Sequence, residues 1–142
     1  MSAQAAVFRA LSAMHAADTG AGGLNETDGA ALVRTFLREG YAETRTNNWP
    51  AVYVSMPVDN GNNAVSAYHT FSPVRLRVET FRDYDYTAQD AVMARLYTKL
   101  HRQTITDPSG EWTFSPVFVA RVAQLSPTES TMNAVMEILV SS

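Results

Sequence analysis

Apolar side chains recur every three or four positions in two early segments, residues 3–16 and residues 28–38. This spacing predicts two helices. Three glycines after the first segment and Gly40 after the second provide the expected stops, and Thr27 and Asp28 are candidate caps for the second helix. The predicted apolar stripes are Val7, Leu11 and Met14 in the first helix, and Leu32, Val33, Phe36 and Leu37 in the second.

The period changes to two from Ala51 onward, which predicts a strand over residues 51–56 that ends at Pro57. The clearest alternation covers residues 74–81. A strand with this pattern has one packed face and one polar face. Its packed face holds Val74, Leu76, Val78 and Thr80, and its polar face holds Arg75, Arg77 and Glu79.

A third amphipathic segment follows over residues 87–102, and it predicts the clearest helix of the chain. Two further strands are expected over residues 112–125, bent at Pro116, and over residues 131–140. The predicted fold is therefore a single α+β domain spanning 1–142, with elements in the order α-α-β-β-α-β-β. We expect a four-stranded, mainly antiparallel sheet with two or three helices packed on one face.

The second face of this sheet is expected to need a cover, because its outward positions are not strongly polar. Helices on one side leave the other side open, and a contiguous exposed apolar patch usually marks an interface. A subunit or partner surface is one interpretation, and long loops folded over the face are the other. The apolar residues in question are Val117, Val119, Ala123, Leu125, Val135 and Leu139, interrupted by Arg121.

Composition narrows the classes of function. The 142 residues include no cysteine, which excludes a disulfide scaffold, a thiolate metal site and a cysteine nucleophile. Eleven basic and fourteen acidic side chains leave a net charge of −3, a poor electrostatic match for a protein that grips phosphates. The three histidines fall in separate elements without ligand spacing. Neither a signal peptide nor a membrane-spanning stretch is recognisable, so we expect synthesis in a cytoplasm and no membrane partner.

Three groups of residues could carry chemistry, and each has a simpler structural reading. Asp83 and Asp85 could bind Mg²⁺ or could complement the N-terminus of the following helix. A basic stripe could contact nucleic acid or could lie on a solvated helix face. Three aromatic residues could line a pocket or fill the core. The stripe is Arg95, Lys99 and Arg102, and the aromatic residues are Trp112, Phe114 and Phe118. We predict no catalytic residue, no cofactor and no enzyme activity.

A family resemblance rests on the order of elements and on residues 49–100. The segment Trp49-Pro50-Ala51-Val52-Tyr53-Val54 forms a strand preceded by proline, and Val74-Arg75-Leu76-Arg77-Val78-Glu79-Thr80-Phe81 leads into the helix starting at Tyr84-Asp85-Tyr86-Thr87-Ala88-Gln89-Asp90-Ala91. This arrangement resembles the tail terminator, or tail completion, proteins of long-tailed DNA bacteriophages and gene transfer particles. Head–tail joining proteins of the neck share the size and remain an alternative, as does a small-ligand-binding or enzymatic α+β domain.

The resemblance implies a structural virion protein that forms a ring, typically a hexamer, at the head-proximal end of the tail tube. Its partners would be other copies of itself, the tail tube protein and the head–tail connector, with DNA only in transit through the lumen. Acidic net charge suits such a lumen. The expected subunit or partner contacts are Arg75, Arg77, Glu79, Val117, Val119, Arg121, Val135 and Leu139, with Arg75, Arg77 and Glu79 in cross-strand or intersubunit ion pairs. The expected loop contacts with the tube or neck are Asp59, Asn60, Asn62 and Asn63.

Overall fold

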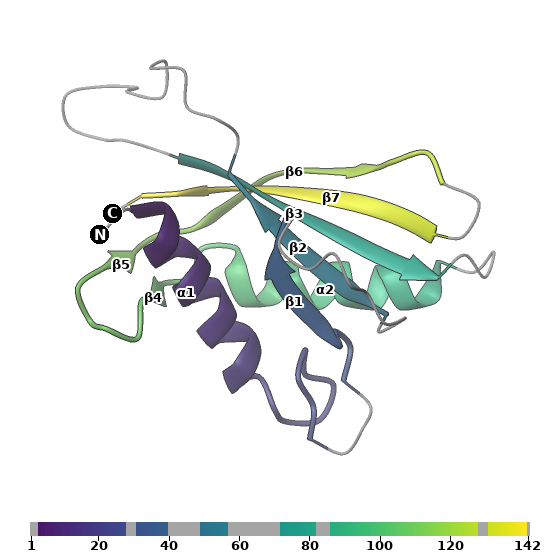
Figure 1. The fold of residues 1–142 in the computed structure, drawn as a ribbon, viewed down its shortest axis with the longest axis horizontal. Helices are drawn as coiled ribbons and strands as arrows, with labels where there is room; N and C mark the ends of the chain where they lie inside the picture. The colour runs from purple at the N-terminus through teal and green to yellow at the C-terminus, as the bar shows by residue number, and fades with distance from the viewer. Residues whose placement is uncertain are drawn as a thin grey trace.

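A five-stranded mixed sheet forms the centre of the fold in a computed structural model, which describes residues 3–27, 31–39, 49–56, 72–81, 86–127 and 131–141 (Figure 1). The strand order is β1-β2-β3-β7-β6, with β1 parallel to β2 and every other neighbouring pair antiparallel. A second sheet pairs only β4 with β5. In chain order the elements are α1 (Ala3–Ala17), β1 (Thr35–Arg38), β2 (Ala51–Ser55), β3 (Ser72–Phe81), α2 (Thr87–Leu100), β4 (Ile105–Thr106), β5 (Thr113–Phe114), β6 (Phe118–Gln124) and β7 (Thr131–Val140).

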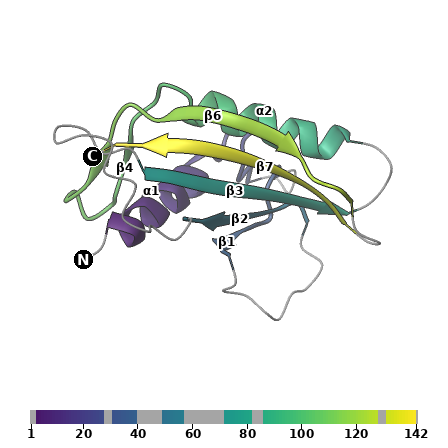
Figure 2. The ribbon, with the colours of Figure 1, turned by 90° about the horizontal axis from the view of Figure 1, so that it is seen from above.

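Both helices cover the same face of the large sheet (Figure 1). Seen from above, α2 runs along the side of the sheet that ends in β6, whereas α1 lies towards the side that ends in β1 (Figure 2). Each helix buries an apolar stripe against alternate strand residues, as the hydrophobic effect requires of an amphipathic helix. The shared core includes Val7 and Leu11 from α1, Val92, Leu96 and Leu100 from α2, and Val52, Leu76, Val78, Met136 and Ile138 from the sheet.

The long β3–β7 pair sets the two faces of the sheet. Its register places Leu76 opposite Met136 and Arg77 opposite Val135. Because side chains alternate along a strand, the even-numbered residues of β3 point to the helices and the odd-numbered residues point to the opposite face. We call this opposite side, which neither helix covers, the open face.

The predicted four-stranded sheet is wrong, as is the helix predicted over residues 28–38. Residues 35–38 form the edge strand β1, which pairs in parallel with β2. The spacing of Phe36 and Leu37 fits a helix, but Phe36 packs on the core from a strand, stacked on the ring of His15 with 5.0 Å between centroids. Pairing with a distant segment decided the conformation here, which the local pattern does not encode.

The strand predicted over residues 112–125 is divided in two. The Ser115–Pro116 peptide bond is cis, and the chain there passes from β5, paired with β4, to β6, paired with β7. Proline lacks the N–H that a continuous ladder needs. The strands predicted at 51–56, 74–81 and 131–140 and the helices predicted at 3–16 and 87–102 are confirmed, with ends that differ by two residues or fewer. In the described part of the chain, neither helix combines the length and apolar character needed to span a bilayer.

Candidate interaction surfaces

The open face carries a network of polar side chains centred on Arg77. Its guanidinium donates to both carboxylate oxygens of Glu39, at 3.1 and 2.8 Å, and to Glu79 at 2.8 Å. It also donates to the Asn133 side-chain oxygen at 2.7 Å and lies 4.6 Å from the ring centroid of Tyr53. The network therefore joins β1, β2, β3 and β7 across the open face.

The two acidic partners of Arg77 hold its pKa above the ordinary value. Burial by itself would lower the Arg77 pKa, but the hydrogen bonds and negative charges of Glu39 and Glu79 raise it by more than burial lowers it. Glu79 is only 5% exposed and also accepts a hydrogen bond from the Trp49 indole nitrogen at 2.9 Å. A buried carboxylate is costly unless it has hydrogen-bond donors, and Arg77 and Trp49 supply them to Glu79.

Sequence reasoning identified Arg77 and Glu79 but missed Glu39, Trp49 and Tyr53. No local signal marked Glu39, because it follows a segment that was predicted to be helical. The β1–β2 pairing carries it next to Arg77, although 38 positions separate them in the chain. Of the two readings for the charged residues of β3, the structure contains the cross-strand one: Arg75 pairs with Glu137 of β7 at 3.2 Å, and Arg77 pairs with Glu39, which directly follows β1. Arg77 also pairs with Glu79 within β3 itself.

The predicted interface residues of the last two strands do not share one face. Val117 is fully buried in the core. A bulge between Val119 and Arg121 shifts the alternation, so Val119 pairs with Ile138 on the helix side, whereas Arg121 pairs with Glu137 on the open face. Val135 and Leu139 of β7 also lie on the open face; Val135 is 7% exposed and Leu139 is half-buried. Of these five residues, Arg121 is exposed and the other four are buried or half-buried.

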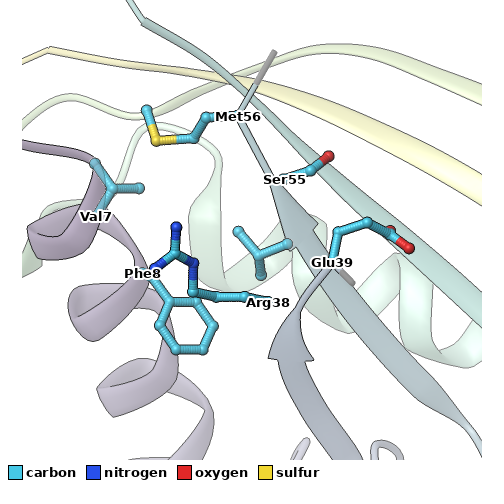
Figure 3. Close-up of a pocket in the computed structure, with 7 residues that line it drawn as sticks. Val7, Phe8, Arg38, Glu39, Ser55 and Met56 are labelled. Atoms are coloured by element: carbon cyan, nitrogen blue, oxygen red, sulfur yellow. The ribbon is translucent and has the colours of Figure 1, made fainter. Parts of the chain in front are cut away.

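A small hollow lies between α1 and the ends of β1 and β2 (Figure 3). Its volume is about 160 Å³, and it is lined by Val7 and Phe8 of α1, by Arg38 at the end of β1 and Glu39 directly after it, and by Val54, Ser55 and Met56. Figure 3 shows the Arg38 guanidinium next to the Phe8 ring and the Glu39 carboxylate turned away from it. This carboxylate belongs to the Arg77 network, so the hollow holds the Arg38 guanidinium among the apolar side chains of Val7, Phe8 and Met56 and the hydroxyl of Ser55.

A larger hollow of about 390 Å³ shares Phe8 and Arg38 with the first and adds Ala5, Arg9 and Leu37. We call this one the β1 hollow, because it borders the edge strand. A third, of about 400 Å³, lies between the end of α1, the end of α2 and β4. Its polar lining includes Lys99 and Thr104.

The basic stripe on α2 has a use that neither sequence reading anticipated. Arg95 binds both carboxylate oxygens of Asp18, at 2.9 and 2.6 Å, and Lys99 lies 3.5 Å from the same carboxylate. Asp18 is 5% exposed and directly follows α1, so these contacts tie α1 to α2. Hydrogen bonding to Arg95 holds the Asp18 pKa below its ordinary value. Arg102 is exposed just beyond α2.

The remaining candidates are placed as follows. Phe114 is buried and stacks on Trp112, with 6.2 Å between centroids, whereas Phe118 lies edge-on to His101. Two groups of predicted site residues lie outside the described part of the chain: the pair Asp83 and Asp85, and the loop residues Asp59, Asn60, Asn62 and Asn63. Among the residues that the structure describes, no three side chains of histidine, aspartate or glutamate are grouped to share a metal ion.

The two edges of the large sheet differ in character. The β6 edge is seven residues long and exposes Val122, at 55%, with Leu125 just after it at 40%. The β1 edge is four residues long and borders the β1 hollow. A comparison of the chain with protein-family models and with curated proteins finds no match.

Proposed function

We propose that this chain is a structural subunit of the tail or neck of a long-tailed bacteriophage or related particle. In this role it forms a ring of six subunits that caps the tail tube, provides the surface for docking to the head and lets DNA pass. A head–tail joining protein of the same neck is the alternative within this class. The ring is the property on which both assignments depend.

The observation that carries the proposal is the pair of unlike sheet edges. A closed ring of identical subunits needs two different, complementary patches on each subunit. An exposed strand edge is a template for pairing with another chain, and natural proteins usually cover or protect it. The β6 edge exposes Val122, and the β1 edge on the other side of the sheet borders an apolar hollow.

Charge and the resemblance add support. The net charge of −3 disfavours tight phosphate contacts, as expected of a subunit that surrounds DNA in transit. The strand-to-helix passage that carries the resemblance to tail terminators corresponds to β3 (Ser72–Phe81) followed by α2 (Thr87–Leu100). The open face carries ion pairs of Arg77 with Glu39 and Glu79 and of Arg75 with Glu137.

Native mass spectrometry of the purified chain, supported by negative-stain images, tests the ring. We expect a closed oligomer, with six copies as the leading stoichiometry. If the chain is monomeric alone, the same measurement is repeated with a tail tube protein and with a head–tail connector. Assembly on the tube identifies a tail terminator, and assembly on the connector alone identifies a neck protein. A stable dimer without rings, or no assembly with either partner, contradicts the proposal.

A further inference from the structure

The free side of β6 presents a defined set of backbone groups. The Leu125 N–H donates to the Asn133 carbonyl of β7 at 2.9 Å. In the same register, Ala123 lies opposite Val135 and Arg121 opposite Glu137. In an antiparallel ladder, hydrogen-bonded residues alternate with residues whose N–H and C=O point away from the partner. The backbone groups of Val122 and Gln124 therefore point out of the sheet.

The free side of β1 can be read in the same way. The Thr35 N–H donates to the Pro50 carbonyl at 3.4 Å, and the Glu39 N–H donates to the Val54 carbonyl at 2.8 Å. Odd-numbered residues of this parallel pair thus bond to β2, and the backbone groups of Phe36 and Arg38 point outward. Among the residues that the structure describes, β1 and the segment of β6 beyond its bulge therefore each present two outward residues.

The directions of the two edges match. Three antiparallel steps from β2 to β6 and one parallel step from β2 to β1 leave β6 and β1 running in opposite directions. When copies stand side by side in one orientation, β6 of one copy meets β1 of the next in the antiparallel sense. The segment of β6 beyond its bulge is also short, like β1, so the two edges are similar in length.

We propose that a second copy of this chain occupies the β6 edge through its β1 strand, so that neighbouring subunits share one continuous sheet. This inference rests on the proposed ring and names its contact. The outward residues set the register: Val122 lies opposite Arg38 of the neighbouring copy. It follows that Ala123 lies opposite Leu37, and Arg121 opposite Glu39.

Charge and shape support this register. Arg121 and Glu39 both lie on the open face, one exposed on each edge, and opposite charges across a strand pair are favourable. On the helix side, Val122 is 55% exposed and meets the edge that holds the β1 hollow, whose walls include Ala5 and Phe8. Pairing would thus cover an exposed valine and match an arginine to a glutamate in one step.

Disulfide cross-linking tests the register directly, because the natural chain has no cysteine. Leu37 and Ala123 would form a pair without mutual backbone hydrogen bonds, for which the Cα separation is about 4.5 Å, within the disulfide range of about 4.4–6.8 Å. We expect the double variant Leu37→Cys/Ala123→Cys to form a covalent ladder up to the full ring under mild oxidation. The control Leu37→Cys/Thr98→Cys places the second thiol on the outward side of α2 and should form no ladder.

Two further variants separate this inference from the proposed function. Val122→Lys protects the edge, and we expect it to raise the concentration needed for ring assembly by about tenfold or more. Thr98→Lys adds the same charge in place of another β-branched residue and should leave assembly unchanged. Rings that persist in Val122→Lys, with no ladder in the double-cysteine variant, overturn this contact but leave the ring intact. Dimers from Ala123→Cys alone indicate that β6 pairs with β6, which also overturns it. Absence of both ladder and rings at high concentration and on both partners refutes the two proposals together.

Discussion

Replacing Asp18 by asparagine tests the contact that joins the two helices. The carboxylate of Asp18 accepts two hydrogen bonds from Arg95, at 2.9 and 2.6 Å, and one from the Leu24 N–H at 2.8 Å. Asparagine has one acceptor oxygen in place of two, and its amide group is a donor that faces the donors of Arg95. The variant therefore loses at least one charge-assisted hydrogen bond and the attraction of the ion pair.

The magnitude follows from the exposure of the partners. Hydrogen bonds to charged groups contribute about 1.5–3 kcal/mol each. Breaking a fully buried pair costs about 3–5 kcal/mol. The Arg95 side chain is 29% exposed, so water replaces part of what it loses. We expect the free energy of unfolding to fall by about 2–3 kcal/mol at pH 7, which corresponds to a drop in Tm of roughly 6–12 °C for a domain of this size.

Urea unfolding followed by tryptophan fluorescence measures this change, with thermal unfolding by circular dichroism as a second readout. Glu111→Gln is the control, because it removes the charge of an exposed carboxylate. Its effect should stay within about 0.5 kcal/mol, as for most surface substitutions. An Asp18→Asn variant that also stays within that range refutes the reasoning, because the Asp18–Arg95 contact would then contribute nothing measurable.

Three more predictions follow. Hydrogen bonds from Arg95 and Arg9 hold the pKa values of Asp18 and Asp107, respectively, below the ordinary 3.8. The free energy of unfolding should therefore be highest above about pH 5 and should fall as the pH drops through 4. Urea midpoints that do not change with pH contradict this. The buried side chain of Gln89 has no hydrogen-bond partner within the described structure, so Gln89→Leu should stabilise the fold by about 1 kcal/mol, and a lower urea midpoint would refute this. Glu79→Gln should cost about 1–2 kcal/mol and alter the fluorescence of Trp49, with unchanged spectra as the contrary result.

Local pattern was sufficient wherever an element packs by its own periodicity. The strict alternation of β3 and the apolar stripe of α2 specified both elements to within two residues. Pattern also indicated that Arg75, Arg77 and Glu79 share a face, because side chains alternate in any strand. It left open whether their partners lay on a neighbouring strand or a neighbouring subunit, since the choice depends on which strands are adjacent.

Long-range pairing decided the rest. Residues 35–38 carry a spacing that suits a helix, yet they form a strand because β2 offers a partner and the core accepts Phe36 from that side. The partner of Arg95 lies 77 positions away, and that of Arg77 on β1 lies 38 positions away. Pairs this far apart lie beyond the short segments on which a hydrophobic period can be recognised.

The sequence by itself thus determined the composition, the charge and the elements whose periodicity is regular. The tertiary structure alone decided the strand order, the two unlike edges and the partners of the buried charges. The physical reason is that a hydrophobic period reports which side of an element is buried, whereas an edge or an ion pair exists only once distant segments are in contact.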